Sequence, residues 1–100
     1  MEFTKDISKQ TITIAIKGRI DTSNAEEFEN IVLQEIKKDF ETVIDFSSIT
    51  YISSAALRVL LSAYKLSAQN GGKLILINVN ELVMEILDMT GLSSILDIKD

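Results

Sequence analysis

Hydroxyl side chains lie at the start of one predicted helix, where Ser53 and Ser54 precede a long apolar run and Arg58 follows one turn later. A serine hydroxyl can accept a phosphoryl group, which adds about −1.5 to −2 charge and three strong acceptor oxygens. On Ser54 this group would lie where unpaired backbone N–H groups and the positive end of the helix dipole favour an anion. Arg58 lies on the same helix face and could pair with it. These residue types can therefore form a site of phosphorylation.

The simpler interpretation of this serine pair is structural. A serine directly before a helix caps it by accepting a hydrogen bond from an unpaired N–H, which contributes about 0.5 to 2 kcal/mol. The local sequence by itself favours capping over phosphorylation. Residues 21–24 allow similar alternatives. Thr22, Ser23 or Asn24 can cap the helix predicted to begin at Ala25, and Asp21 either begins that cap or lies at a binding surface.

The composition narrows the chemistry available to the chain. It contains no cysteine and no histidine, which excludes disulfides, thiol catalysis, Ser-His catalysis and the usual zinc sites. Its acidic residues form no acid–base pair of recognisable spacing, and the sequence has no glycine-rich phosphate loop. The ten basic residues are scattered and the formal net charge is −5, which disfavours nucleic acid as a partner. We therefore expect a binding protein without catalytic residues, metal or cofactor.

The elements that must position the serines begin with strands. Isoleucines alternate with small or polar residues over Ile12 to Ile16, the period of a strand with one buried face, and Glu2 to Ile7 can pair with it as a hairpin. The segments Thr42 to Phe46 and Lys73 to Asn78 are almost continuously apolar, as central strands covered on both faces are. A last short strand is predicted over Ile95 to Ile98.

Helical periodicity marks three segments between these strands. An amphipathic helix is predicted over Ala25 to Lys38, with acidic residues in its first turn and Glu35 on its solvent side. A second helix runs from Ser54 to Gln69 and is followed by Gly71-Gly72, which suits a left-handed C-terminal cap. A third ends at Gly91.

The second helix has a single polar stripe. Its members, at spacings of four, four, three and four, are Ser54, Arg58, Ser62, Lys65 and Gln69. The remaining positions are nearly all apolar or small, so we expect this helix to be more buried than the first. Ser54 begins the one narrow face that should meet solvent.

Strands joined through helices in this way are parallel, with right-handed connections. The order of elements therefore predicts an α/β fold, a single domain over residues 1–100 in which a mixed sheet of four to five strands packs with three to four helices. One hundred residues suffice for one compact domain. No run approaches the ~20 apolar residues that span a bilayer, so we expect a cytoplasmic protein without direct membrane insertion.

Several blocks of the sequence resemble one known family. The segment Ile49 to Leu61 resembles the central motif of STAS domains, the family of sulfate transporter and anti-sigma factor antagonist domains. Gly18-Arg19-Ile20-Asp21 resembles the family's Gly-x-Leu-Asp, Val43 to Phe46 its strand before the motif, and Leu87 to Leu92 the end of its late helix. These blocks occur in the family's order and span nearly the whole chain, which implies a STAS-like fold.

In the antagonist branch of this family, the motif commonly reads Asp-Ser-(Ser/Thr/Ala)-Gly-Leu, and the residue after the Asp is phosphorylated. The resemblance places Ser54 at that position. Ser53 stands where the Asp usually is, which leaves Ser53 as an alternative acceptor, and Ala56 stands where the Gly usually is. The partner-binding residues that the resemblance implies are Asp21, Ser23, Asn24, Ser53, Ser54, Ala56 and Arg58.

The function implied by this resemblance is a partner switch. The unmodified chain would bind an anti-sigma factor that is also a serine kinase of the GHKL type, which frees a sigma factor, and phosphorylation of Ser54 would end that binding. A serine phosphatase is a further expected partner, and ATP would be bound by the kinase. The alternative keeps the fold without the switch, as a STAS accessory subunit of a membrane lipid or anion transporter.

Overall fold

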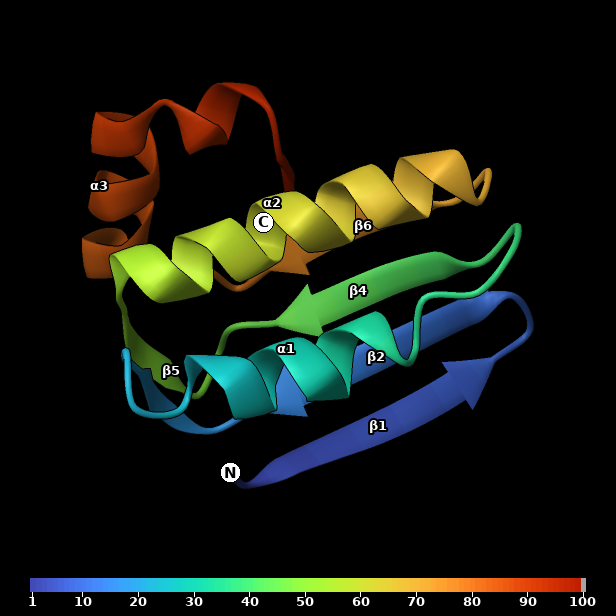
Figure 1. The fold of residues 1–100 in the computed structure, drawn as a ribbon, viewed down its shortest axis with the longest axis horizontal. Helices are drawn as coiled ribbons and strands as arrows, with labels where there is room; N and C mark the ends of the chain where they lie inside the picture. The colour runs from blue at the N-terminus through green and yellow to red at the C-terminus, as the bar shows by residue number, and fades with distance from the viewer. Residues whose placement is uncertain (100) are drawn as a thin grey trace.

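A mixed five-stranded sheet organises residues 1–99, which are the residues that the computed structural model describes (Figure 1). Its strands, in spatial order, are β1 (Phe3–Ser8), β2 (Thr11–Ile16), β4 (Glu41–Asp45), β6 (Lys73–Ile77) and β7 (Asp97–Lys99). β1 is antiparallel to β2, and the other neighbours are parallel. The predicted α/β class and the mixed sheet are confirmed, and β4 and β6 occupy central positions. The last strand begins two residues later than predicted, because a 3₁₀ turn over Leu92–Ser94 precedes it.

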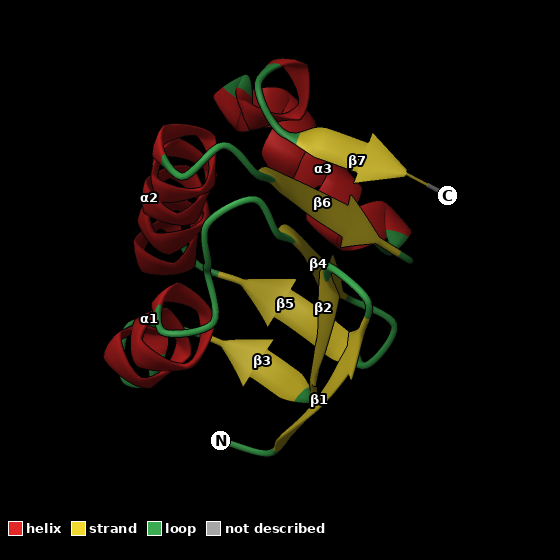
Figure 2. Cartoon of the chain, turned by 90° about the vertical axis from the view of Figure 1, so that its right-hand side faces the viewer, coloured by secondary structure: helices red, strands yellow, loops and turns green. Residues whose placement is uncertain are grey.

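Two helices, α1 (Ala25–Leu33) and α2 (Ser54–Gln69), lie side by side on one face of this sheet (Figures 1 and 2). A third, α3 (Glu81–Thr90), follows β6. The core fills the space between sheet and helices. Its largest fully buried side chains are Phe28, Phe46, Ile12, Ile14, Ile16, Ile20, Ile44, Ile49, Ile52, Leu60, Leu76 and Leu87. Each such side chain contributes about 1.5–3 kcal/mol relative to exposure, which makes this layer the main source of stability.

A second, two-stranded parallel sheet was not predicted from the sequence. It consists of β3 (Gly18–Ile20) and β5 (Ile49–Ile52), which are too short to show a clear alternation of apolar and polar residues. Gly18 adopts a left-handed φ of +106°, which turns the chain directly from β2 into β3. Because β3 and β5 are parallel, their carboxyl ends lie at the same edge, and the helices that follow them begin close together (Figure 2).

The first helix is shorter than predicted. It ends at Leu33 instead of Lys38, and the chain continues in turns to Asp39, whose φ of +63° cannot belong to a right-handed helix. Ile36 and Phe40 still pack against the core from these turns. The apolar period in the sequence therefore extended past the point where the helix stops.

Glu35 is a second correction, because it is buried instead of facing solvent. Its side chain is 6% exposed, and its Oε2 accepts a hydrogen bond from Lys5 Nζ of β1 at 2.9 Å. A buried carboxylate requires a partner of this kind. The residues around Glu35 in the sequence do not supply it, so the sequence pattern could not predict the burial. The ion pair ties the edge strand to the end of α1.

The bounds of α2 and its polar stripe agree with the prediction. The exposed residues of this helix are Ser54, Arg58, Ser62, Lys65, Ala68 and Gln69. The helix ends in a Schellman motif, in which Gly72 N donates to Ser67 O at 2.9 Å and Gly71 has a left-handed φ of +75°. Within residues 1–99, no helix combines the length and apolarity required to cross a bilayer.

Candidate functional site

Two loops at the carboxyl edge of the β3–β5 sheet carry most of the polar residues that the sequence analysis singled out. Residues 21–24 join β3 to α1, and Ser53 joins β5 to α2. A hydrogen bond from Ser53 N to Ile20 O at 2.9 Å holds the two loops together. We call residues 21–24, 53, 54 and 58 the helix-start surface. The fold therefore brings together two loops that are about thirty positions apart in the sequence.

The two serines of this surface have different roles. Ser53 is the N-cap of α2, and its Oγ accepts a hydrogen bond from Ala56 N at 3.3 Å. Ser54 is the first helical residue and is exposed, and its hydroxyl has no hydrogen-bond partner among residues 1–99. The first turn of α2 contains no acidic residue, so no side-chain carboxylate there offsets the positive end of its dipole. An anion attached to Ser54 would meet a favourable local field.

The loop before α1 is braced by its own side chains. Asp21 Oδ1 accepts hydrogen bonds from Ser23 Oγ at 2.6 Å and from Ser23 N at 3.0 Å. Asn24 occupies the N-cap position of α1, but its side chain makes no cap bond to the helix. Instead, Asn24 Oδ1 accepts from Asp21 N at 2.8 Å, and Asn24 Nδ2 donates to Arg19 O at 2.9 Å. The predicted cap is therefore a loop brace, and these hydrogen bonds hold the loop in one conformation.

Arg19 is a residue beside this surface whose contacts the sequence analysis did not identify. Its guanidinium lies 4.8 Å from the centre of the Tyr51 ring, and its Nε lies 3.8 Å from Asp21 Oδ2. The signal in the sequence was its position inside the Gly-Arg-Ile-Asp block. Arg58, by contrast, is exposed and forms no ion pair with any residue in 1–99. Arg19, beside the surface, is therefore tied to its neighbours, whereas Arg58, on the surface, is unengaged.

The side chain of Ala56, which the resemblance placed among the partner-binding residues, is not exposed. It packs in the core beneath α2, with an exposed fraction of 0%. Helical geometry gives the reason, because residue 56 lies two positions after Ser54 and so points to a different face of the helix. Only its backbone N–H takes part, as the donor to the Ser53 cap.

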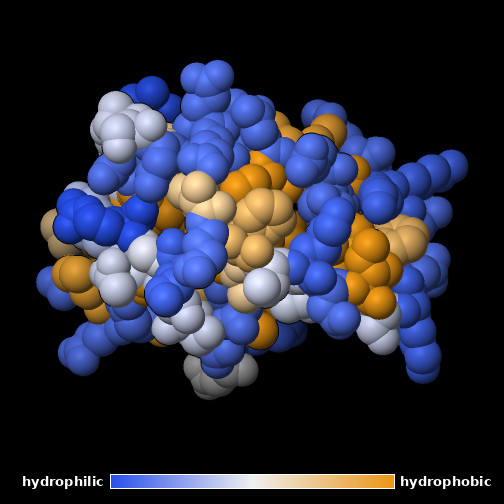
Figure 3. Space-filling model, turned by 90° about the horizontal axis from the view of Figure 1, so that it is seen from below, coloured by the Kyte–Doolittle hydropathy of each residue, from blue (hydrophilic) through white to orange (hydrophobic). Residues whose placement is uncertain are grey.

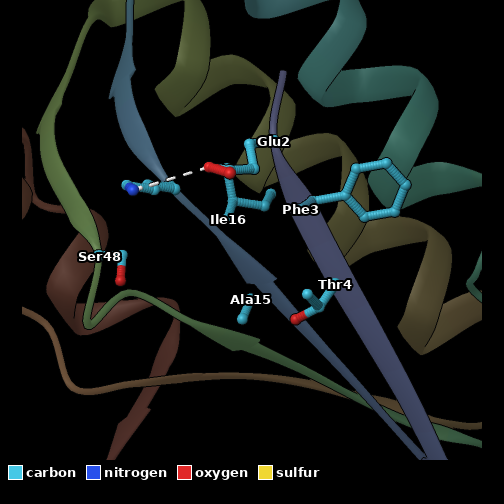
Figure 4. A pocket seen from close by; sticks show the side chains of 7 residues that line it. Glu2, Phe3, Thr4, Ala15, Ile16 and Ser48 are labelled. Atoms are coloured by element: carbon cyan, nitrogen blue, oxygen red, sulfur yellow. Dashed lines mark ion pairs between the residues drawn. The ribbon is translucent and has the colours of Figure 1, made fainter.

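Two cavities lie away from the helix-start surface. A cavity of about 250 Å³ is lined by residues of the N-terminal hairpin and by Ser48, with the Glu2–Lys17 ion pair at 3.8 Å on its margin (Figure 4). Another, of about 280 Å³, lies between α2 and β7. Both are below the ~300–1,000 Å³ that is typical of ligand pockets.

The carboxylates of Asp21 and Asp45 should make the stability of the fold decrease at acid pH. The hydrogen bond from the Ser23 hydroxyl is the main cause that holds the pKa of Asp21 below its usual 3.8. Burial raises the pKa of Asp45, but hydrogen bonds from Asn78 Nδ2 and Ser47 N outweigh burial and lower it below 3.8.

Protons therefore bind these groups more readily in the unfolded chain than in the folded chain. The stability that they contribute is present above pH 3.8 and is lost as the pH falls through the lowered folded values. We expect urea midpoints to decline in that acid range and the decline to be shallower in Asp45→Asn. An equal decline in the variant would contradict the assignment to Asp45.

The sequence is similar to STAS domains and to proteins named as anti-sigma factor antagonists. The family model for the STAS domain matches residues 2–100. BtrV of Bordetella bronchiseptica, a candidate anti-sigma factor antagonist, is 32% identical over 96 residues, which cover 95% of this chain and 83% of BtrV. The anti-sigma-B factor antagonist of Listeria monocytogenes is 28% identical over 97 residues, which cover 96% of this chain and 85% of that protein.

The architecture is also shared with a solved structure. A candidate anti-sigma factor antagonist from Thermotoga maritima superimposes with a TM-score of 0.87 at 25% identity, covering 98% of this chain and 86% of that one. The likeness includes the strands and helices that position the helix-start surface, since it extends over nearly the whole chain.

Proposed function

The chain belongs to the STAS domain family, and from this premise we propose that it is an anti-sigma factor antagonist controlled by phosphorylation of Ser54. Unmodified, it binds an anti-sigma factor of the GHKL serine kinase type through the helix-start surface, and a sigma factor is released. Phosphorylated, it lets the anti-sigma factor go, and a serine phosphatase restores binding. The names of its relatives support the general role.

The exposed and unbonded hydroxyl of Ser54 is the observation that carries the proposal. Ser53 Oγ is engaged as the cap of α2 and the residue is half-buried, whereas Ser54 is exposed. A kinase that approaches this surface therefore reaches Ser54 without breaking a hydrogen bond that holds the fold. Of the two serines, Ser54 is the favoured acceptor.

A phosphate on Ser54 would act on binding more than on folding. The positive end of the α2 dipole and the unengaged Arg58 one turn away both favour the added charge. A partner that covers the helix start would have to strip water from that charge without offering a matching cation. Each ~1.4 kcal/mol of this penalty weakens binding tenfold.

Intact-mass measurement after incubation with ATP and a purified GHKL-type anti-sigma kinase that binds the unmodified chain tests the proposal. Wild type and Ser53→Ala are expected to gain one phosphate, and Ser54→Ala none. Modification of Ser54→Ala but not of Ser53→Ala would move the acceptor to Ser53. No phosphate on any of the three, together with co-purification with membrane transporter components, would instead favour the non-switching accessory subunit.

A further inference from the structure

The strand β1 forms an edge of the main sheet and has neither a proline nor a bulge to keep that edge unpaired. All six of its residues are exposed. Its register with β2 is continuous over six residue pairs without a bulge, and the chain contains no proline. Edge strands are usually blocked by prolines, bulges or charges. The central charge here, on Lys5, is held by Glu35 at 2.9 Å.

Apolar side chains stand along the same strand. Phe3 is 39% exposed and Ile7 is 51% exposed. They are four residues apart, so both project from the same side of β1 as Lys5. Figure 4 shows the Phe3 ring on the side of the strand opposite to Thr4. Figure 3 views the molecule from below, toward the side where Figure 1 places β1, and shows apolar surface gathered among hydrophilic side chains.

The pairing with β2 determines which backbone groups of β1 point outward. Lys17 N donates to Glu2 O at 3.1 Å, which makes Glu2 and Lys17 a hydrogen-bonded pair. Hydrogen-bonded and non-hydrogen-bonded pairs alternate along an antiparallel ladder. The N–H and C=O groups of Phe3, Lys5 and Ile7 therefore point away from β2, toward the outer edge.

We propose that this edge binds a second copy of the chain, with the two β1 strands antiparallel about a twofold axis at Lys5. In this register, residues whose backbone N–H and C=O groups point outward lie opposite one another. Phe3 pairs with Ile7 of the second copy, and Lys5 pairs with Lys5 of the second copy. Each pair can exchange two backbone hydrogen bonds. Both Phe3–Ile7 contacts are aromatic–β-branched pairs, which are favourable across antiparallel strands.

Side-chain charges select this register over its neighbours. Centring the axis on Asp6 would place two aspartates directly opposite each other, and centring it on Thr4 would place Phe3 against Lys5. In the proposed register the two lysines face each other, but each ammonium is neutralised by its Glu35. On the other face, Thr4 lies opposite Asp6 of the second copy and can donate its hydroxyl to that carboxylate.

The interface would be small and separate from the helix-start surface. Two edge strands bury an area at or below the ~1,200 Å² that marks weak and transient complexes, so the dimer forms mainly at high concentration. The strand β1 lies along the lower side of the molecule in Figure 1, whereas α2 lies above α1. Ser54 therefore stays accessible in the dimer, and the two functions can be tested independently.

Sedimentation velocity of the full chain from about 10 µM to about 1 mM tests the proposal. Wild type is expected to shift toward a dimer, Ile7→Lys to associate at least tenfold more weakly, and Leu82→Lys to behave as wild type. Leu82 on α3 is the matched control, because it has the same 51% exposure as Ile7. Amide exchange should slow with concentration at Phe3, Lys5 and Ile7. A wild type that stays monomeric, a dimer unaffected by Ile7→Lys, or a dimer lost in Leu82→Lys would each overturn the proposal.

Discussion

The Ser54→Asp substitution is expected to weaken binding to the anti-sigma factor by about thirtyfold or more, whereas Ser54→Ala should bind as wild type within a few-fold. An unpaired charge buried in an interface costs about 2–5 kcal/mol, and 2 kcal/mol corresponds to about thirtyfold in the dissociation constant. The alanine variant loses only a hydroxyl that has no partner among residues 1–99. Titration calorimetry with the purified kinase partner, without ATP, would measure both values.

A control variant with a negative charge elsewhere on α2 separates the effect of position from the effect of charge. Ser62→Asp is the matched control, since Ser62 is also an exposed serine of the polar stripe and lies two turns beyond Ser54. At ~1.5 Å per residue it is about 12 Å from the helix start. We expect it to change the affinity only slightly. Equal weakening by both aspartates would show that net charge, and not the position of Ser54, controls binding.

The Gly72→Ala substitution is expected to destabilise the chain by about 3 kcal/mol or more, a large share of the ~5–15 kcal/mol that is typical of a small domain. A Cβ at residue 72 would lie 2.1 Å from the backbone oxygen of Phe40 and 3.1 Å from its carbonyl carbon. Phe40 directly precedes β4, so relief of the clash would move either that strand or the turn between α2 and β6. Urea unfolding followed by circular dichroism would measure the loss.

Gly91→Ala separates this steric effect from backbone strain. Gly91 has a left-handed φ of +82°, but nothing lies within 4 Å of the position of its added Cβ. The substitution should therefore cost only the strain of about 1–2 kcal/mol that an L-residue pays in that conformation. If Gly91→Ala proved as damaging as Gly72→Ala, the close approach of Phe40 would not be the cause.

In the proposed switch, the two serines and the braced loop would have different roles on the helix-start surface. Ser53 maintains the helix start by capping, which leaves Ser54 available for modification. Asp21 and Asn24 hold the loop beside it in one conformation through hydrogen bonds within the loop. A preformed surface loses little conformational entropy on binding. Under the proposed function, the charge of a phosphate on Ser54 would therefore dominate the change in affinity.

The sequence by itself determined those features that depend on neighbours along the chain. The bounds of α2 followed from its apolar period and from Gly71-Gly72, and its exposed stripe followed from helical spacing. Alternation identified β2, and continuous apolar runs identified β4 and β6 to within one residue. The position of Ser54 at the start of the exposed stripe followed from this pattern, whereas its assignment as the phosphate acceptor came from the resemblance to STAS domains.

Only the tertiary structure decided the features that depend on contacts between distant segments. The pairing of β3 with β5 places residues 21–24 beside Ser53, although neither short strand carries a clear pattern of its own. Glu35 is buried because Lys5, thirty residues away, supplies its partner. α1 stops at Leu33 because the chain must turn back toward β4, although the apolar side chains beyond it still reach the core. In each case the stability of the local structure depends on a residue that becomes a neighbour only when the chain has folded. Local sequence patterns carry no information about such contacts.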